Sequence, residues 1–168
     1  MKDIYELAER FRDNFARNGC MFATAESCTG GLISASLTEV PGSSSWFERG
    51  FVTYTNKAKQ ELLGVSPDTL ASFGAVSVET AREMARGALR HSHADIAVGV
   101  TGIAGPDGGT PDKPVGTVCI GFAMRNGFLG ARVFSLKGQR HEIRAQSVII
   151  ALEGMLELAD RKTLDDYT

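Results

Sequence analysis

The fold is decided by the stretch Ile96-Ala97-Val98-Gly99-Val100-Thr101-Gly102, in which a run of apolar and small residues leads directly into a glycine-rich turn. A continuous run of this kind is typical of a strand that other elements cover on both faces. Residues 21–25 (MFATA) form a similar short run, and they also lead into a turn, which holds Ser27, Gly30 and Gly31. We therefore expect a sheet in which two buried strands end in glycine turns.

Helical and strand-like patterns alternate along the rest of the chain. Apolar residues at steps of three and four predict a first helix that ends at Asn18-Gly19. Asn126-Gly127 predicts a hairpin between the last two strands. Further helices are predicted over residues 30–38, 56–64, 66–68 onward, 77–89 and 139–158, with Asn56, Ser66 and Ser77 as N-caps, and further strands over residues 50–55, 115–124 and 129–136. This order predicts an α/β fold, a three-layer α/β/α sandwich with a mixed, mostly parallel sheet that has one antiparallel member.

Length and composition define the class of protein. The 168 residues predict one domain over residues 1–168, with its core at about 4–158 and a loose tail at 161–168. The chain has no apolar run long enough to span a bilayer and no secretory signal, so we expect a cytoplasmic protein without a membrane partner. A net charge of −2 supplies no general attraction to nucleic acid. The sequence leaves the oligomeric state open, a homo-oligomer included.

Ser27 lies where a predicted strand meets a predicted helix. In sheets of this kind, ligands bind at the carboxyl ends of the strands, where both glycine turns are expected. The N–H groups and the positive end of the following helix would favour a developing oxyanion near the Ser27 hydroxyl. Ser27 and Thr29 are equally suited to a structural role as helix caps. Gly30 and Gly31 would let a ligand or a backbone segment approach closely.

No histidine is placed to activate a nucleophile at this turn. Cys28 is a rival nucleophile, but His91 and His93 are expected at the opposite edge of the sheet, and His141 is weakly placed. The sequence therefore shows no Ser-His-Asp or Cys-His arrangement.

Lysine is the alternative base. Tyr54 closes a strand at the ligand edge, and Lys57 and Lys59 lie in the first turn of the next helix. The helix dipole disfavours a cation at that position and so lowers the pKa of a lysine. Two solvated surface lysines are the alternative interpretation.

Two further segments carry potential ligand-binding groups. The turn at residues 101–109 (TGIAGPDGG) offers the Thr101 hydroxyl and main-chain N–H groups that can surround an anion or a carbonyl. Asp107 in this turn is interpreted as a turn residue and not as a metal ligand. Arg140 and Arg144 lie one helical turn apart, where they could clamp a phosphate or simply be solvated.

Four ordered motifs together resemble the CinA C-terminal domain family. They are residues 24–31 (TAESCTGG), 50–59 (GFVTYTNKAK), 101–109 (TGIAGPDGG) and 116–118 (GTV), and the resemblance extends over about residues 4–158. It implies a nicotinamide-nucleotide amidase, which hydrolyses nicotinamide mononucleotide to nicotinic acid mononucleotide and ammonia through a serine and a lysine. It implies no metal and no other cofactor. Many members of the family carry this domain behind a larger N-terminal domain. We expect this chain to be the stand-alone form, without that larger domain.

The resemblance also implies roles for individual residues. Ser27 matches the nucleophile and Lys59 its base, with Tyr54 as a supporting hydrogen-bond partner and Lys57 left at the surface. Arg140 matches a phosphate-binding arginine, with Arg144 secondary. The remaining expected substrate-binding residues come from the two glycine turns, and they are Thr29, Gly30, Gly31, Thr101, Gly102 and Gly105. The alternative is a catalytically silent nucleotide-binding module, or a regulatory protein associated with competence or DNA damage.

Overall fold

The apolar run that begins at Ile96 forms β3 (Ile96–Gly102), the central strand of the sheet in the computed structural model, which describes residues 3–167. On one side β3 pairs with β1 (Phe22–Glu26), which in turn pairs with β2 (Phe47–Val52). On the other side it pairs with β4 (Thr117–Met124), which pairs with β5 (Leu129–Ser135). The described part of the chain thus contains one five-stranded sheet in the order β2-β1-β3-β4-β5.

Within this sheet, β4 runs against the other strands. β1 is parallel to β2 and β3, whereas β4 is antiparallel to both β3 and β5. In the β4–β5 hairpin, Asn126 Oδ1 accepts a hydrogen bond from the Phe128 N–H at 2.9 Å, and Gly127 has a left-handed φ of 102°. The predicted mixed, mostly parallel sheet is confirmed.

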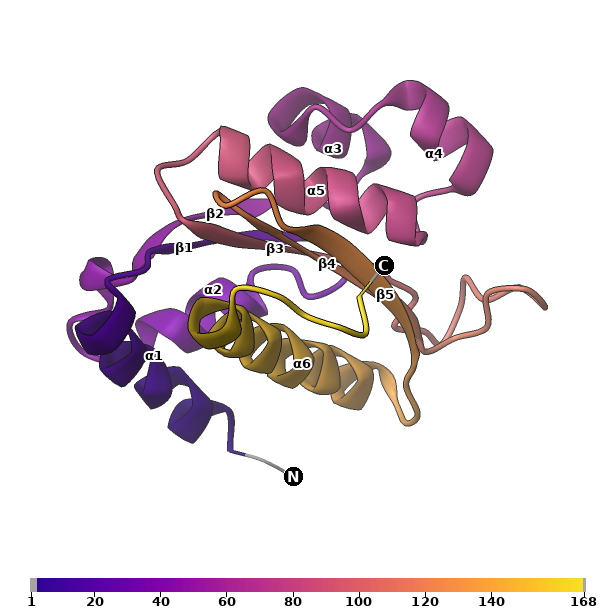
Figure 1. Cartoon of the computed structure of the whole chain (residues 1–168). Coiled ribbons are helices and arrows are strands. Elements are labelled where there is room, and N and C mark those ends of the chain that lie inside the picture. Colours follow the sequence, from indigo (N-terminus) through magenta and orange to yellow (C-terminus); the bar gives the residue numbers. More distant parts are fainter. Residues whose placement is uncertain (1–2, 168) are drawn as a thin grey trace.

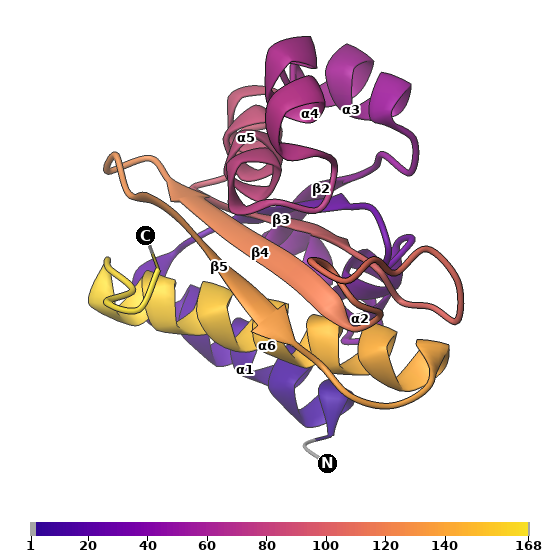
Figure 2. The same cartoon turned by 90° about the vertical axis from the view of Figure 1, so that its right-hand side faces the viewer.

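Helices cover both faces of the sheet (Figure 1). One layer contains α1 (Ile4–Asn18), α2 (Leu32–Thr38) and α6 (Arg140–Arg161), and the other contains α3 (Asn56–Leu63), α4 (Pro67–Phe73) and α5 (Val78–Arg90). Figure 2 shows the sheet between these two layers. The larger apolar cluster lies under α1 and α6 and includes Phe11 and Phe22, whose rings meet edge to face at 4.8 Å. The predicted three-layer α/β/α sandwich is confirmed.

Several predicted boundaries differ from the structure. β2 ends at Val52 and not at residue 55, and Thr55, not Asn56, is the N-cap of α3. The Thr55 hydroxyl accepts a hydrogen bond from the Ala58 N–H at 3.1 Å, so the cap falls one residue earlier than expected. α2 begins at Leu32 because Gly30 and Gly31 have left-handed φ angles of 59° and 102°.

The expectation of a loose C-terminal tail is wrong for the described residues. Leu164 is only 4% exposed, and the Tyr167 ring meets the Phe122 ring edge to face at 5.2 Å. Apolar side chains after α6 therefore extend the core over β4 and β5. Met1, Lys2 and Thr168 lie outside the described residues. No helix in residues 3–167 is long and apolar enough to span a membrane.

α5 approaches the sheet closely because two glycines face it. Gly99 of β3 and Gly121 of β4 are direct partners across the antiparallel ladder. A Cβ atom at either position would lie 2.6 Å from the Ala81 carbonyl oxygen of α5. The Ala81 backbone therefore rests on this glycine pair, and any side chain there would push the helix outward.

Replacing Gly121 with alanine should destabilise the protein by about 1–3 kcal/mol, because the new methyl group overpacks the α5–sheet contact. Urea denaturation of wild type and Gly121→Ala measures the difference. Ser135→Ala, at an exposed position of β5, is the control and should change stability by less than about 0.5 kcal/mol. An unchanged Gly121→Ala protein would contradict the close approach of α5.

Candidate active site

The ends of β1, β2 and β3 bring Ser27 into register with the neighbouring segments. Ser27 follows the last residue of β1, and its N–H donates to the Val100 carbonyl of β3 at 2.9 Å. On the other side, the Thr53 N–H donates to the Glu26 carbonyl at 2.9 Å. These ladder hydrogen bonds continue past the end of β1 and hold the start of the Ser27 turn at the carboxyl edge of the sheet.

The side chain of Lys59 meets the hydroxyl of Ser27. Lys59 Nζ lies 2.9 Å from Ser27 Oγ, and it donates to the carbonyl oxygens of Thr53 at 3.0 Å and Tyr54 at 3.3 Å. Lys59 is in the first turns of α3 and is only 1% exposed, whereas Lys57 is exposed and pairs with Glu61. The structure thus brings Lys59 and not Lys57 to Ser27.

Burial lowers the pKa of Lys59 below its usual value, because the charged ammonium loses its hydration. The hydrogen-bond acceptors around Nζ are uncharged oxygens, two of them carbonyls. A lysine with a lowered pKa has a larger neutral fraction near pH 7, and its lone pair can then accept the Ser27 hydroxyl proton. The pair therefore has the geometry of a nucleophile and a general base.

Cys28, the alternative nucleophile, is in a different electrostatic state. Its side chain is buried, and burial raises the pKa of the thiol to about 11. At neutral pH the thiol stays protonated and is a weak nucleophile. Ser27, beside the lysine amine, is the better candidate.

A pocket of about 190 Å³ opens onto Ser27 and Lys59. Ala75, Val76 and Ala104 line it with small apolar side chains, and Arg140 lies at its boundary. A second pocket of about 520 Å³ is also lined by Ala104 and Arg140 and continues to Gly138, Gln139 and His141 at the start of α6. The two pockets are neighbours that share Ala104 and Arg140 in their walls, with the nucleophile in the first and the N-terminus of α6 in the second.

Tyr54 contacts Ser27 and Lys59 through its main chain. The Tyr54 carbonyl oxygen is 3.5 Å from Ser27 Oγ, whereas its phenol oxygen accepts a hydrogen bond from Arg140 Nη2 at 3.0 Å. Arg140 Nη1 also donates to the Gly105 carbonyl at 2.8 Å. Arg140 therefore links the segment after β2 to the loop after β3. In this structure Tyr54 meets Ser27 and Lys59 as a hydrogen-bond acceptor through its main-chain carbonyl and not through its phenol.

The first glycine turn, residues 29–31, is not arranged as we expected for a substrate-binding segment. Thr29 is fully buried, and its hydroxyl has no hydrogen-bond partner among residues 3–167. A Cβ atom added at Gly30 or Gly31 would point toward Arg144 or Val52, so these glycines lie against protein side chains at the edge of the site. Thr29 is accordingly not placed to contact a substrate in the described pocket.

Glu26 is a residue of this site that the sequence motifs did not single out. It is fully buried, and its carboxylate accepts hydrogen bonds from the Ile33 and Ser34 N–H groups at 2.8 and 3.0 Å and from Ser34 Oγ at 2.8 Å. Glu26 thus occupies the N-terminus of α2, which we expected to face the Ser27 hydroxyl. The sequence signal that could have identified Glu26 is an acidic residue directly after the apolar run at residues 21–25.

Arg144 does not act with Arg140 as an open clamp. Its Nε and Nη2 atoms donate to the carbonyl oxygens of Cys28 at 3.0 Å and Thr29 at 3.1 Å. These two hydrogen bonds use the Nε/Nη2 edge of the guanidinium to hold the turn after Ser27. The expectation that Arg144 is a secondary phosphate ligand therefore does not fit its contacts.

The second glycine turn closes the site from the β3 side. The Thr101 hydroxyl, expected to bind substrate, donates to the Ala75 carbonyl at 2.8 Å and so holds the pocket wall before α5. Gly102 lines the pocket, and a Cβ atom there would lie 2.8 Å from Val118 Cγ2. Gly105 supplies the carbonyl that Arg140 binds. In the described chain, no three His, Cys, Asp or Glu side chains gather to form a metal site.

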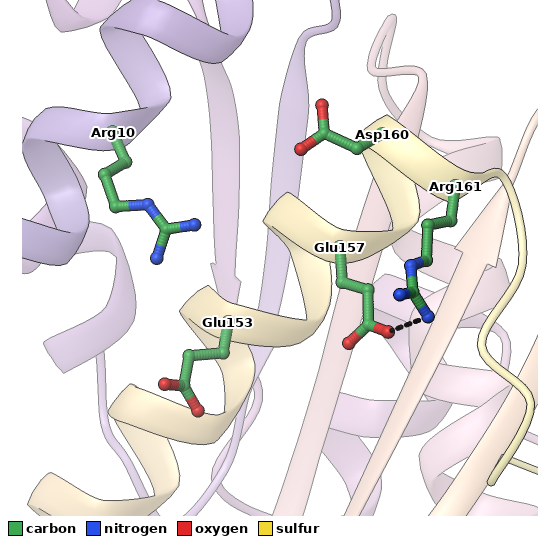
Figure 3. A pocket seen from close by; sticks show the side chains of 5 residues that line it. All are labelled: Arg10, Glu153, Glu157, Asp160 and Arg161. Atoms are coloured by element: carbon green, nitrogen blue, oxygen red, sulfur yellow. Dashed lines mark hydrogen bonds and ion pairs between the residues drawn. The ribbon is translucent and has the colours of Figure 1, made fainter.

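A third pocket, of about 450 Å³, lies between α1 and α6 and is lined by charged residues (Figure 3). Glu157 pairs there with Arg161 at 3.3 Å, and Arg10 faces them from α1. Glu157 and Arg161 belong to the C-terminal half of α6, whereas Arg140 and Arg144 are in its first turns. The charged pocket is therefore separate from the Ser27 site.

Comparison with known proteins gives a consistent set of relatives. The family model of the CinA C-terminal domain matches residues 4–159. "Nicotinamide-nucleotide amidohydrolase PncC" from Enterobacter agglomerans is 48% identical over 155 residues, which cover 92% of this chain and 94% of that protein. A "CinA-like protein" from Chlorobaculum tepidum is 54% identical over 138 residues, but this chain spans only 33% of its length.

A solved structure supports the same grouping. The competence/damage inducible protein CihA from Agrobacterium tumefaciens is 51% identical and superimposes with a TM-score of 0.91, over 96% of this chain and 98% of that one.

The lowered pKa of Lys59 predicts a pH-dependent stability. Lysine has an ordinary pKa of 10.5, so between the native pKa and 10.5 the unfolded chain binds a proton that the native protein lacks. The free energy of unfolding of wild type, relative to Lys59→Met, should therefore rise as the pH increases toward 10.5. Urea denaturation from neutral to alkaline pH measures this difference. Lys57→Met, which removes an exposed lysine paired with Glu61, is the control. If the difference in free energy of unfolding between wild type and Lys59→Met is the same at every pH, the lowered pKa is contradicted.

Proposed function

The chain belongs to the CinA C-terminal domain family, and from this premise we propose that it hydrolyses the carboxamide of nicotinamide mononucleotide to nicotinic acid mononucleotide and ammonia. The observation that carries the proposal is the buried Lys59 amine, 2.9 Å from the Ser27 hydroxyl. The name of the relative from Enterobacter agglomerans, nicotinamide-nucleotide amidohydrolase, supports the choice of a nicotinamide nucleotide as the substrate.

In the proposed first step, neutral Lys59 takes the proton from Ser27 as Oγ attacks the carboxamide carbon. The carbonyl becomes a tetrahedral oxyanion. The C–N bond then breaks, Lys59 returns its proton to the leaving nitrogen, and ammonia departs. Ser27 is left as an ester of the nicotinic acid group. Water, deprotonated by Lys59, hydrolyses this ester and restores the free serine, so that one water is consumed for each ammonia released.

The oxyanion needs main-chain donors close to Ser27. The Ile33 and Ser34 N–H groups of α2 are already bonded to the Glu26 carboxylate. The proposal therefore draws the donors from the turn at Cys28 and from the loop after Gly102, both of which line the pocket.

The two neighbouring pockets suit the two ends of a nucleotide. The flat pyridinium ring, whose positive charge is delocalised, can lie against the small side chains of Ala75, Val76 and Ala104. The ribose phosphate would then extend past Arg140 toward the start of α6. Arg140 is placed to exchange its hydrogen bond to the Tyr54 phenol for one to a phosphate oxygen. In this proposal the enzyme is cytoplasmic and recycles pyridine nucleotides for NAD synthesis.

Removal of either member of the Ser27–Lys59 pair should abolish catalysis. Ammonia release from nicotinamide mononucleotide should fall at least about 1,000-fold in Ser27→Ala and in Lys59→Ala, because nucleophile and base act as one unit. A coupled glutamate dehydrogenase assay measures the ammonia, and circular dichroism verifies the fold. Lys57→Ala removes the exposed neighbouring lysine and should retain wild-type activity. If folded wild type releases no ammonia, a silent nucleotide-binding module becomes the better interpretation.

Arg140 should set the preference for the phosphorylated substrate. Arg140→Met should raise KM for nicotinamide mononucleotide about 10- to 100-fold, which corresponds to the loss of a charge-assisted hydrogen bond. KM for nicotinamide riboside, which lacks the phosphate, should change little. Steady-state ammonia release with both substrates tests this, with Arg161→Met as a charge-matched control far along α6. Equal losses for both substrates would argue against a phosphate contact.

A further inference from the structure

We infer that Arg144 and Glu26 are positioning residues, which hold the Ser27 turn from opposite sides so that the Ser27 hydroxyl stays against Lys59. This inference rests on the proposed function for the reaction it serves. It assigns to two charged side chains of the site a role in orienting the nucleophile, and it assigns neither of them to the substrate.

Arg144 controls the peptide groups that follow Ser27. Its Nε donates to the Cys28 carbonyl at 3.0 Å and its Nη2 to the Thr29 carbonyl at 3.1 Å. A peptide plane has few ways to rotate once its carbonyl is held by a charged donor, so two consecutive planes are set by one guanidinium. The preceding residue on α6, Ile143, is 1% exposed, which anchors this part of the helix in the core.

Gly30 allows the turn to adopt the left-handed conformation in which it lies beside Arg144. A Cβ atom at Gly30 would lie 3.4 Å from Arg144 Nη2, and the residue has a left-handed φ of 59°. A larger residue would meet the guanidinium and strain the turn. The glycine that we expected to face a ligand thus faces the arginine that holds the turn.

Glu26 holds the other side of Ser27. Its carboxylate accepts three hydrogen bonds from Ile33 and Ser34, which ties the end of β1 directly to the first turn of α2. A buried carboxylate at a helix N-terminus is stabilised by the donors and by the helix dipole. Ser27 lies between this anchor and the turn that Arg144 holds.

Free rotation of the Ser27 turn would separate the nucleophile from its base. A displacement of about 1 Å at a reacting group is enough to lower a rate about 100-fold. Residues that act through the turn should therefore change the rate of acylation while the binding of substrate stays the same.

The test compares two reactions of the same serine. The first is ammonia release from nicotinamide mononucleotide. The second is p-nitrophenolate release from p-nitrophenyl acetate, in which the acetyl group passes to Ser27 Oγ, the hydroxyl proton passes to Lys59 and p-nitrophenolate leaves. The rate of Ser27→Ala is subtracted as background. The small ester has no phosphate, so it reports on the serine alone.

Arg144→Met should lower kcat for ammonia release and the Ser27-dependent ester rate by the same factor, about 100-fold, with KM for the nucleotide within about threefold of wild type. Arg144→Lys restores one charged donor and should recover about tenfold of that loss. Glu26→Gln should show the same joint loss, because its amide group faces the Ile33 and Ser34 donors with one acceptor oxygen fewer. Arg161→Met is the control and should behave as wild type.

Two results would overturn the inference. If Arg144→Met raises KM for nicotinamide mononucleotide tenfold or more and leaves the ester rate unchanged, Arg144 is a phosphate ligand. If each variant has a normal rate per folded molecule, with folded protein counted by circular dichroism, both residues serve only stability. A third result separates this inference from the proposed function. If wild type releases no ammonia, but its ester reaction needs Ser27 and is slowed by Arg144→Met, the proposed function is refuted and the positioning role remains.

Discussion

The hydrogen bond between the Lys59 amine and the Ser27 hydroxyl is the interaction on which the rest of the site depends. An ammonium group taken out of water loses a large hydration free energy, and Lys59 is only 1% exposed. Three oxygen atoms around Nζ, from Ser27, Thr53 and Tyr54, offset part of this loss. The partners come from the ends of β1 and β2, so the sheet edge and the first turns of α3 must keep a fixed spacing. The lowered pKa of Lys59 follows from the same burial.

The charged side chains near this pair, Glu26, Arg140 and Arg144, each form hydrogen bonds with a different part of the site. The Glu26 carboxylate accepts hydrogen bonds from the start of α2, and the Arg144 guanidinium donates to two carbonyl oxygens of the Ser27 turn. Within residues 3–167, Arg140 is bonded only to a phenol and a single carbonyl, and it borders both pockets. Two arginines one helical turn apart therefore have different surroundings: Arg144 binds the turn after Ser27, and Arg140 borders the space available to a ligand.

Most of the fold could be predicted from local patterns. The unbroken apolar run at Ile96 predicts a strand covered on both faces, and Asn126-Gly127 predicts the hairpin; both are present. The errors lie where long-range packing overrides local signals. The tail after Arg161 looks loose because few of its residues are apolar, yet Tyr167 packs on Phe122 of β4, which is distant from it in the sequence. The boundary error at Thr55 arises because Thr55 and Asn56 have similar capping ability, whereas α2 begins late at Leu32 because Gly30 and Gly31 adopt left-handed φ angles.

The sequence by itself determined the three-layer class, the carboxyl edge of the sheet as the place of the site and, through its motifs, the resemblance that selected Ser27 and Lys59. Composition and spacing alone left Lys57 and Lys59 equivalent, because both lie in the same helical turn. Only the tertiary structure decided which lysine is buried against Ser27, which end of Tyr54 faces the site and which arginine borders the pockets. These are contacts between residues 32 to 116 positions apart, such as Lys59 with Ser27 and Arg144 with Cys28. Local periodicity cannot specify them, because they depend on how separate strands and helices meet in space.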